Sequence, residues 1–201
     1  MSDLSKLKPA ETLLIMKGEN AAFKDLMKYT LMDLILKQVL EIKETVRRVK
    51  RGRRFKDKRI KYVVKGNNFD NYSPNIFEII YLSTYQHTPE IKIVLSKLIK
   101  VAYSAAKTEE EYRNCILETH PFPKSFKKSF FQKYFGGVSI TEEGKERKSM
   151  IDIQLSEIDN KFDSLLKDNP KEALSLLLEI GGNIFLLKNI DFELLRKIDK
   201  S

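Results

Sequence analysis

Residues 39–66, VLEIKETVRRVKRGRRFKDKRIKYVVKG, form the stretch that decides the fold. Apolar and polar residues alternate with period two over residues 39–43 and again over residues 59–64, as they do in half-buried β-strands. Residues 51–54, RGRR, are typical of a turn, and residues 65–68, KGNN, give a second turn signal. The stretch therefore predicts a β-hairpin.

The same stretch carries the charge excess of the chain. Residues 43–65 hold 12 Lys and Arg residues against two acids, Glu44 and Asp57, a net charge of +10. The whole chain has a net charge of +9, so the remainder is close to neutral. A local concentration of this kind can create an anion-facing patch. The candidate nucleic-acid or anion-binding residues are Arg47, Arg48, Lys50, Arg51, Arg53, Arg54, Lys56, Lys58 and Arg59.

Two interpretations of this basic hairpin are open. Its cations can contact a phosphate backbone or anionic lipid headgroups, and arginine suits bidentate phosphate contacts. Alternatively, the cations solvate a hairpin and block edge-to-edge aggregation. The density of arginine at the turn exceeds what edge protection needs, which favours anion binding, with nucleic acid ahead of membrane.

Outside the hairpin, apolar residues recur at spacings of three and four, as in amphipathic helices. Pro, Ser, Thr and Asn residues at the starts of these segments are typical helix-start signals. The fold class expected is therefore α+β, predominantly helical. Helices are expected over residues 9–17, 21–38, 73–82, 88–106, from Thr108 past Ile116, over 125–135, from Thr141 until Asn169 and Pro170 end it, over 171–180, and after Asp191. A short extended piece is expected at residues 138–140.

The pattern changes from strand to helix near residues 67–73, where Gly, Asn, Asp and Ser cluster. This change predicts a domain over residues 1–70 with the basic hairpin and a helical domain over residues 71–201. Phenylalanines and lysines are interleaved in residues 122–135 of the second domain. They can stack bases beside phosphate-binding lysines, but their four-residue spacing favours an amphipathic helix with its rings in the core.

The composition, 42% hydrophobic and 32% charged over 201 residues, is that of a globular protein. A single cysteine, Cys115, excludes an internal disulfide framework. No apolar run is long enough for a transmembrane helix, and the first residues lack a signal-peptide pattern, so a cytoplasmic location is expected.

No cofactor, metal site or enzymatic activity is expected. His87 and His120 lie 33 residues apart, outside any metal-ligand spacing. The sequence holds none of the nucleotide-binding, nucleophile-elbow or zinc-protease motifs. Cys115 lies on an apolar helical face, which favours a buried packing role.

Helix, helix, then a hairpin with a basic turn is the order of a winged-helix domain, and residues 9–66 resemble one. The resemblance places residues 21–38 as recognition helix and residues 50–58 as wing. Residues 125–145 resemble a second, degenerate winged-helix unit. Residues 7–11 and 170–187 are similar to helical-plus-winged modules of uncharacterised bacterial proteins. The resemblance implies nucleic-acid binding or protein–protein contact.

The predicted recognition helix departs from the winged-helix pattern. Asp25 and Asp33 are acids, and Met27, Leu31 and Met32 widen its apolar stripe. This composition does not favour base readout by that helix.

The sequence thus predicts a non-enzymatic module that binds the DNA phosphate backbone through the basic wing. The alternative is a protein-interaction or anionic-membrane-surface adaptor, which docks through the hairpin or through the apolar residues 184–187.

Overall fold

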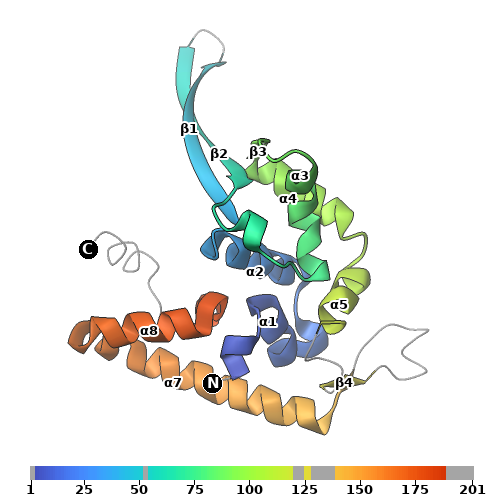
Figure 1. Ribbon diagram of the computed structural model, residues 1–201, viewed down its shortest axis with the longest axis vertical. Helices are drawn as coiled ribbons and strands as arrows, with labels where there is room; N and C mark the ends of the chain where they lie inside the picture. Colours follow the sequence, from blue (N-terminus) through green and yellow to red (C-terminus); the bar gives the residue numbers. More distant parts are fainter. Residues whose placement is uncertain (1–2, 52–53, 120–124, 128–138, 189–201) are drawn as a thin grey trace. The chain divides into compact units, whose positions relative to one another are not determined.

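The computed structural model describes residues 3–51, 54–119, 125–127 and 139–188. The protein is α+β and mostly helical, as predicted, with small antiparallel sheets (Figure 1). The chain divides into two compact units, one formed by Thr30–Thr119 and one by Met1–Tyr29 together with His120–Ser201. We call them the hairpin unit and the terminal unit.

The hairpin unit begins with the second half of helix α2 (Phe23–Leu36), whose first half belongs to the terminal unit. Its further elements are β1 (Leu40–Arg51), β2 (Arg54–Lys65), the 3-10 turns η3 (Phe69–Asn71) and η4 (Ile76–Glu78), α3 (Ile79–His87), β3 (Ile93–Val94), α4 (Leu95–Ala105) and α5 (Glu109–Leu117). The helix predicted after Thr108 is confirmed, since the Thr108 hydroxyl accepts a hydrogen bond from the Glu111 amide at 3.1 Å.

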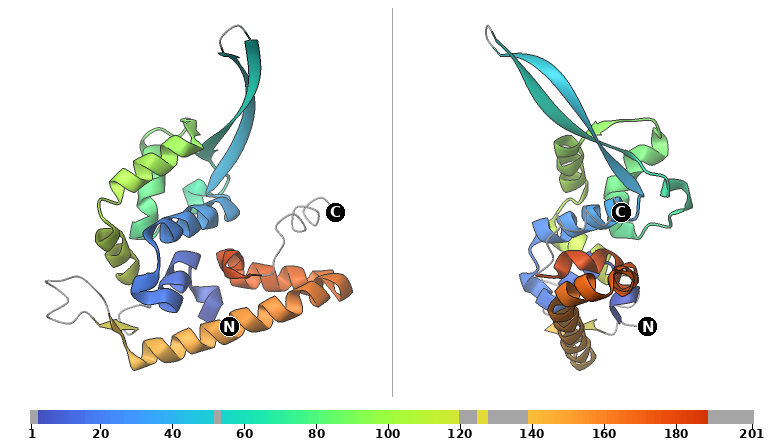
Figure 2. Two further views of the ribbon diagram at one scale, coloured as in Figure 1. Left: turned by 180° about the vertical axis from the view of Figure 1, so that it is seen from behind. Right: turned by 90° about the vertical axis from the view of Figure 1, so that its left-hand side faces the viewer.

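The predicted hairpin is confirmed, and it is longer than the alternating residues indicated. β1 and β2 are each 12 residues long and pair in register from Leu40 opposite Lys65 to Arg51 opposite Arg54. At about 3.4 Å per residue, the strands extend about 40 Å. In Figures 1 and 2 they reach far beyond β3, α3 and α4 of the same unit and coil around each other.

The predicted helix start at Thr88 is wrong. Residues 88–91 form a turn, and Ile93 and Val94 then pair with Val63 and Tyr62 of β2 before helix α4 begins at Leu95. The local signals of Thr88, Pro89 and Glu90 favour a helix. Pairing with β2 and burial of Ile93, which is 8% exposed, outweigh them.

Buried tyrosines tie the base of the hairpin to the helices of its unit. The Tyr85 hydroxyl donates a hydrogen bond of 3.0 Å to the Val63 carbonyl, and its ring meets Phe69 edge-on. The Tyr112 hydroxyl donates one of 2.9 Å to the Thr30 hydroxyl. Burial raises the pKa of Tyr85 to about 12 and raises the pKa of Tyr112 well above its ordinary value.

This shift predicts an alkaline loss of stability that depends on Tyr85. The folded state keeps the Tyr85 proton up to about pH 12, whereas the unfolded chain releases it near pH 10. The free energy of unfolding should therefore fall by about 1.4 kcal/mol per pH unit between these values for this group alone. The Tyr85→Phe variant should have a free energy of unfolding lower by about 1 kcal/mol at neutral pH. Its free energy of unfolding should lack the part of the fall between pH 10 and 12 that comes from Tyr85. Urea unfolding at pH 8, 10 and 11 measures both effects, and equal slopes would contradict the assignment.

The terminal unit is helical, with a two-stranded sheet among its described residues. Its elements are η1 (Asp3–Lys6), α1 (Pro9–Lys17), η2 (Gly18–Asn20), the first half of α2, β4 (Phe126–Lys127), β5 (Ser139–Ile140), α7 (Glu142–Asp168), α8 (Pro170–Ile180) and η6 (Gly181–Leu186). The predicted cap of the long helix is confirmed, since the Thr141 hydroxyl accepts from the Gly144 amide at 3.0 Å. The buried Asn183 side chain donates to the carbonyls of Leu4 and Leu7, each at 2.8 Å, and so joins the two ends of the unit.

The predicted helix over residues 125–135 is wrong at its start. Ser125 is in a turn, and Phe126 and Lys127 form a strand paired with Ile140 and Ser139. The Ser125 carbonyl also accepts a hydrogen bond from the Thr141 amide at 3.0 Å. These strand contacts come from a segment more than ten residues away, which helical spacing cannot reveal. Residues 128–138 and the predicted helix after Asp191 lie outside the described residues, as does His120.

The two compact units differ from the division at residue 70 predicted from the sequence. Strand β3 and Tyr85, both beyond residue 70, contact β2, so the hairpin belongs with helices α3 to α5. Asn183 binds the N-terminal residues, so the two chain ends share the other unit. Such long-range contacts leave no mark in the local composition.

Candidate functional site

The outer part of the hairpin is the candidate functional site. We call residues 44–61 the basic ribbon, because β1 and β2 pair here without a third strand, β3 reaching only Tyr62 and Val63. Every described side chain of the ribbon from Glu44 to Arg48 and from Phe55 to Arg59 is exposed. A ribbon of two strands is marginally stable alone in water, so its length and exposure need an explanation outside the core.

The strand register assigns the cations to two faces, because residues directly opposite each other project to the same side. Arg47 lies opposite Lys58, and Lys56 follows on the same side two residues along β2. We call these three residues the cationic face. Among the residues that the structure describes, none of the three has an ion-pair partner.

The opposite face mixes both charges with apolar groups. Arg48 lies opposite Asp57, and Arg59 is 3.6 Å from the Glu44 carboxylate. The Phe55 ring lies under the Arg48 guanidinium, with 5.3 Å between them. We call this side, formed by Glu44, Val46, Arg48, Phe55, Asp57 and Arg59, the mixed face.

The nine candidate residues therefore do not form one uniform surface. Arg47, Lys56 and Lys58 lie together on the cationic face, and Arg48 and Arg59 lie on the mixed face beside acids. For Lys50, Arg51 and Arg54 the structure places the backbone in the strands and does not describe the side chains. Arg53 lies outside the described residues.

Sequence reasoning missed two exposed apolar residues of the ribbon. Val46 is 62% exposed and Phe55 is 60% exposed, both on the mixed face. They lie outside the two alternating stretches of the sequence, and their place on one face follows only from the strand register.

The helix in the predicted recognition position packs one face into the fold. Met27 and Leu31 of α2 are buried, and the Asp33 carboxylate is buried as well, 2.6 Å from the Lys37 ammonium. This agrees with the departure noted in its sequence. Lys24 and Lys28 on the other face of α2 are exposed, but the ribbon presents the denser group of accessible cations.

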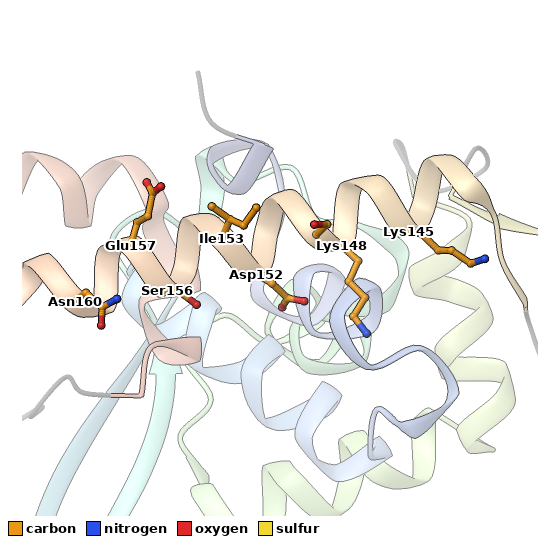
Figure 3. Close-up of a pocket in the computed structure, with 8 residues that line it drawn as sticks. Lys145, Lys148, Asp152, Ile153, Ser156, Glu157 and Asn160 are labelled. Carbon is orange, nitrogen blue, oxygen red and sulfur yellow. The ribbon is translucent and has the colours of Figure 1, made fainter.

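Other surfaces are weaker candidates. Of the apolar residues 184–187, the first three belong to η6, which packs against α1 and α8, and Ile184 and Leu187 are only 6% exposed. The depression in Figure 3 is lined by α7 alone, with Lys148, Asp152 and Asn160 arrayed along one helix. Because no second element brings a polar group into this depression, it lacks the converging polar groups of a ligand-binding pocket.

The described residues hold no group of histidine, cysteine and acidic side chains that could bind a metal ion. Burial raises the pKa of the half-buried Cys115 thiol, with Glu118 and Glu111 adding to the shift, so its environment does not favour the thiolate. None of the described helices is long and apolar enough to cross a bilayer.

Comparison of the chain with protein-family models, with curated proteins and with solved structures found no match.

Proposed function

We propose that this protein is a non-enzymatic nucleic-acid-binding module that holds the phosphate backbone of double-stranded DNA through the basic ribbon. Binding is largely independent of sequence and sensitive to salt, because its main contacts are to phosphates. The observation that carries the proposal is the cationic face, where Arg47 and Lys58 lie directly opposite each other without a carboxylate between them.

This arrangement costs stability in the free protein. Like charges directly opposite in a sheet are destabilising, and Lys56 adds a third charge on the same side. Protection of the strand edges from aggregation needs charge, but it does not need like charges paired across the two strands. The mixed face shows the alternative, since Asp57 lies opposite Arg48 there. A bound polyanion removes the repulsion on the cationic face.

The shape of the ribbon fits the same ligand. The major groove of B-DNA, about 12 Å wide, admits a two-stranded β-ribbon. Along the chain, the ribbon follows helices α1 and α2, as the wing follows the helices of a winged-helix domain. We include that relationship in the proposal. In either arrangement the cations reach phosphates, while α2 does not read bases.

Reversing the three charges of the cationic face should reduce the salt dependence of binding. The variant Arg47→Glu, Lys56→Glu, Lys58→Glu loses three phosphate contacts. The slope of log K against log salt should therefore fall by about 2.7, at about 0.9 per contact. Fluorescence anisotropy with a labelled duplex, from low to physiological salt, measures both affinity and slope.

The matched control is Lys161→Glu, Lys167→Glu, Lys171→Glu, which makes the same charge change on exposed residues of the terminal unit. It should keep the slope of the unmodified protein. An equal effect of the two variants would show that only net charge matters and would overturn the ribbon as the site. Pelleting with acidic vesicles, without duplex binding at low salt, would replace the proposal with a membrane-surface adaptor.

A further inference from the structure

Phe55 projects from the ribbon without a role in the fold. It is 60% exposed and lies opposite Lys50, one pair before the last pair of the ribbon. Full burial of a phenylalanine stabilises a protein by roughly 1.5–3 kcal/mol, and most of that gain is absent here. Its ring contacts the Arg48 guanidinium at 5.3 Å, an exposed contact worth about 0.5–1 kcal/mol.

The surroundings of the ring match the chemistry of a base-stacking group. Arg48 lies beside the ring on the mixed face, and Lys56, the next residue of β2, projects from the cationic face on the other side of the ribbon. Apolar side chains that enter a DNA base stack are flanked by such phosphate contacts, which hold the backbone in place. An aromatic face stacks on any base, so this contact does not require sequence recognition.

We infer that Phe55 inserts into the base stack of bound DNA, so that duplexes with an interrupted stack are the preferred ligands. The inference rests on the proposed nucleic-acid function. Entry into an intact duplex costs a few kcal/mol of unstacking, which stacking on phenylalanine, at about 1–3 kcal/mol per base, offsets only in part. An unpaired base removes most of that cost in advance. The ribbon therefore selects a bulged duplex over an intact one.

The affinities of two labelled duplexes, identical except for one unpaired base at the centre, test this preference. The unmodified protein should bind the bulged duplex about tenfold more tightly, within the 5- to 150-fold range of one stacked base. The Phe55→Ala variant should bind both duplexes equally and keep the salt dependence. The Val46→Ala variant is the control, because Val46 is equally exposed on the same face but cannot stack.

Equal binding of the two duplexes by the unmodified protein, or an unchanged preference in Phe55→Ala, would overturn the stacking role and leave the proposed function intact. Failure to bind either duplex at low salt would overturn the proposed function, and the stacking role with it.

Tryptophan fluorescence gives an independent readout, since the sequence contains no tryptophan. The Phe55→Trp variant carries a single indole, which should be quenched when it stacks on a base. The Val46→Trp variant should change much less. Salt-sensitive binding that leaves Trp fluorescence of the Phe55→Trp variant unchanged would contradict insertion.

Discussion

Replacing residues 46–59 with Asn-Gly should abolish nucleic-acid binding while the rest of the protein stays folded. The replaced segment holds nine cations and one acid, so the net charge of the chain falls from +9 to +1. Affinity for a duplex at low salt should fall at least about 100-fold, since most non-specific affinity comes from phosphate contacts. Anisotropy titration measures the loss.

The register explains why the remaining strands should still pair. Thr45 lies opposite Ile60, six residues before the pair of Arg51 and Arg54 that the natural two-residue connection joins. Hydrogen-bonded and non-hydrogen-bonded pairs alternate along an antiparallel ladder, so an even shift keeps the same kind of pair beside the turn. Asn-Gly is the favoured two-residue hairpin turn. The free energy of unfolding should therefore change by less than about 1 kcal/mol, because the deleted side chains that the structure describes are exposed.

A full-length control separates charge from shape. In this variant the same nine cations become glutamine and the ribbon keeps its length. Loss of binding in both variants would assign the affinity to the charges. Binding by the glutamine variant with loss in the shortened variant would assign it to the shape of the ribbon, and full binding by the shortened variant would place the site elsewhere.

The existence of the hairpin could be predicted from the sequence, but its length could not. Alternation is clear only near the base, where one side of the sheet is buried, as Leu40 and Val63 show. Residues 44–48 have both faces in water, so no hydrophobic pattern records that they are strand. Hydrogen bonds between β1 and β2 nonetheless continue to Arg51 and Arg54.

The candidate cations could be named from the sequence, but their division between two faces could not. It depends on the register, in which Arg47 meets Lys58 and Arg48 meets Asp57. A slip of one residue would place different partners opposite each other and change which side is uncompensated. Turn type and loop length set the register, and residues 51–54 alone do not show which of them remain in the strands.

Helix caps were predicted well because their signals are local. Thr108 and Thr141 both accept the expected amide hydrogen bond. The signals of Thr88 and Ser125 are equally local, yet strands β3 and β4 form near them instead. In both cases the deciding partner lies elsewhere in the chain, on β2 or β5.

Replacing Gly66 with alanine should cost about 3 kcal/mol or more of unfolding free energy, at the upper end of overpacking effects. A Cβ atom at this buried position would overlap the Gln38 carbonyl oxygen and come within 2.7 Å of its carbon. Both obstacles are backbone atoms, so no side-chain rotation relieves the overlap. Urea unfolding measures the loss.

The clash affects the backbone contacts between residues 38–39 and residues 66–68, which hold the base of the ribbon against its unit. The Gly66 amide donates to the Val39 carbonyl at 2.9 Å, and the Asn68 amide donates to the Gln38 carbonyl at 3.0 Å. Movement of residue 38 therefore loosens both bonds between the end of α2 and the end of β2. Amide exchange should accelerate first at the base of the hairpin, at residues 40–43 and 62–65.

Two neighbouring substitutions test whether the effect comes from this close approach. The exposed Asn67→Ala variant should change stability by about 0.5 kcal/mol or less. The Gln38→Gly variant should not destabilise, because Gln38 has a φ of 55° that glycine adopts without strain. A Gly66→Ala variant as stable as Asn67→Ala would mean that the α2–β1 connection can move aside. The orientation of the ribbon would then not be fixed by its base.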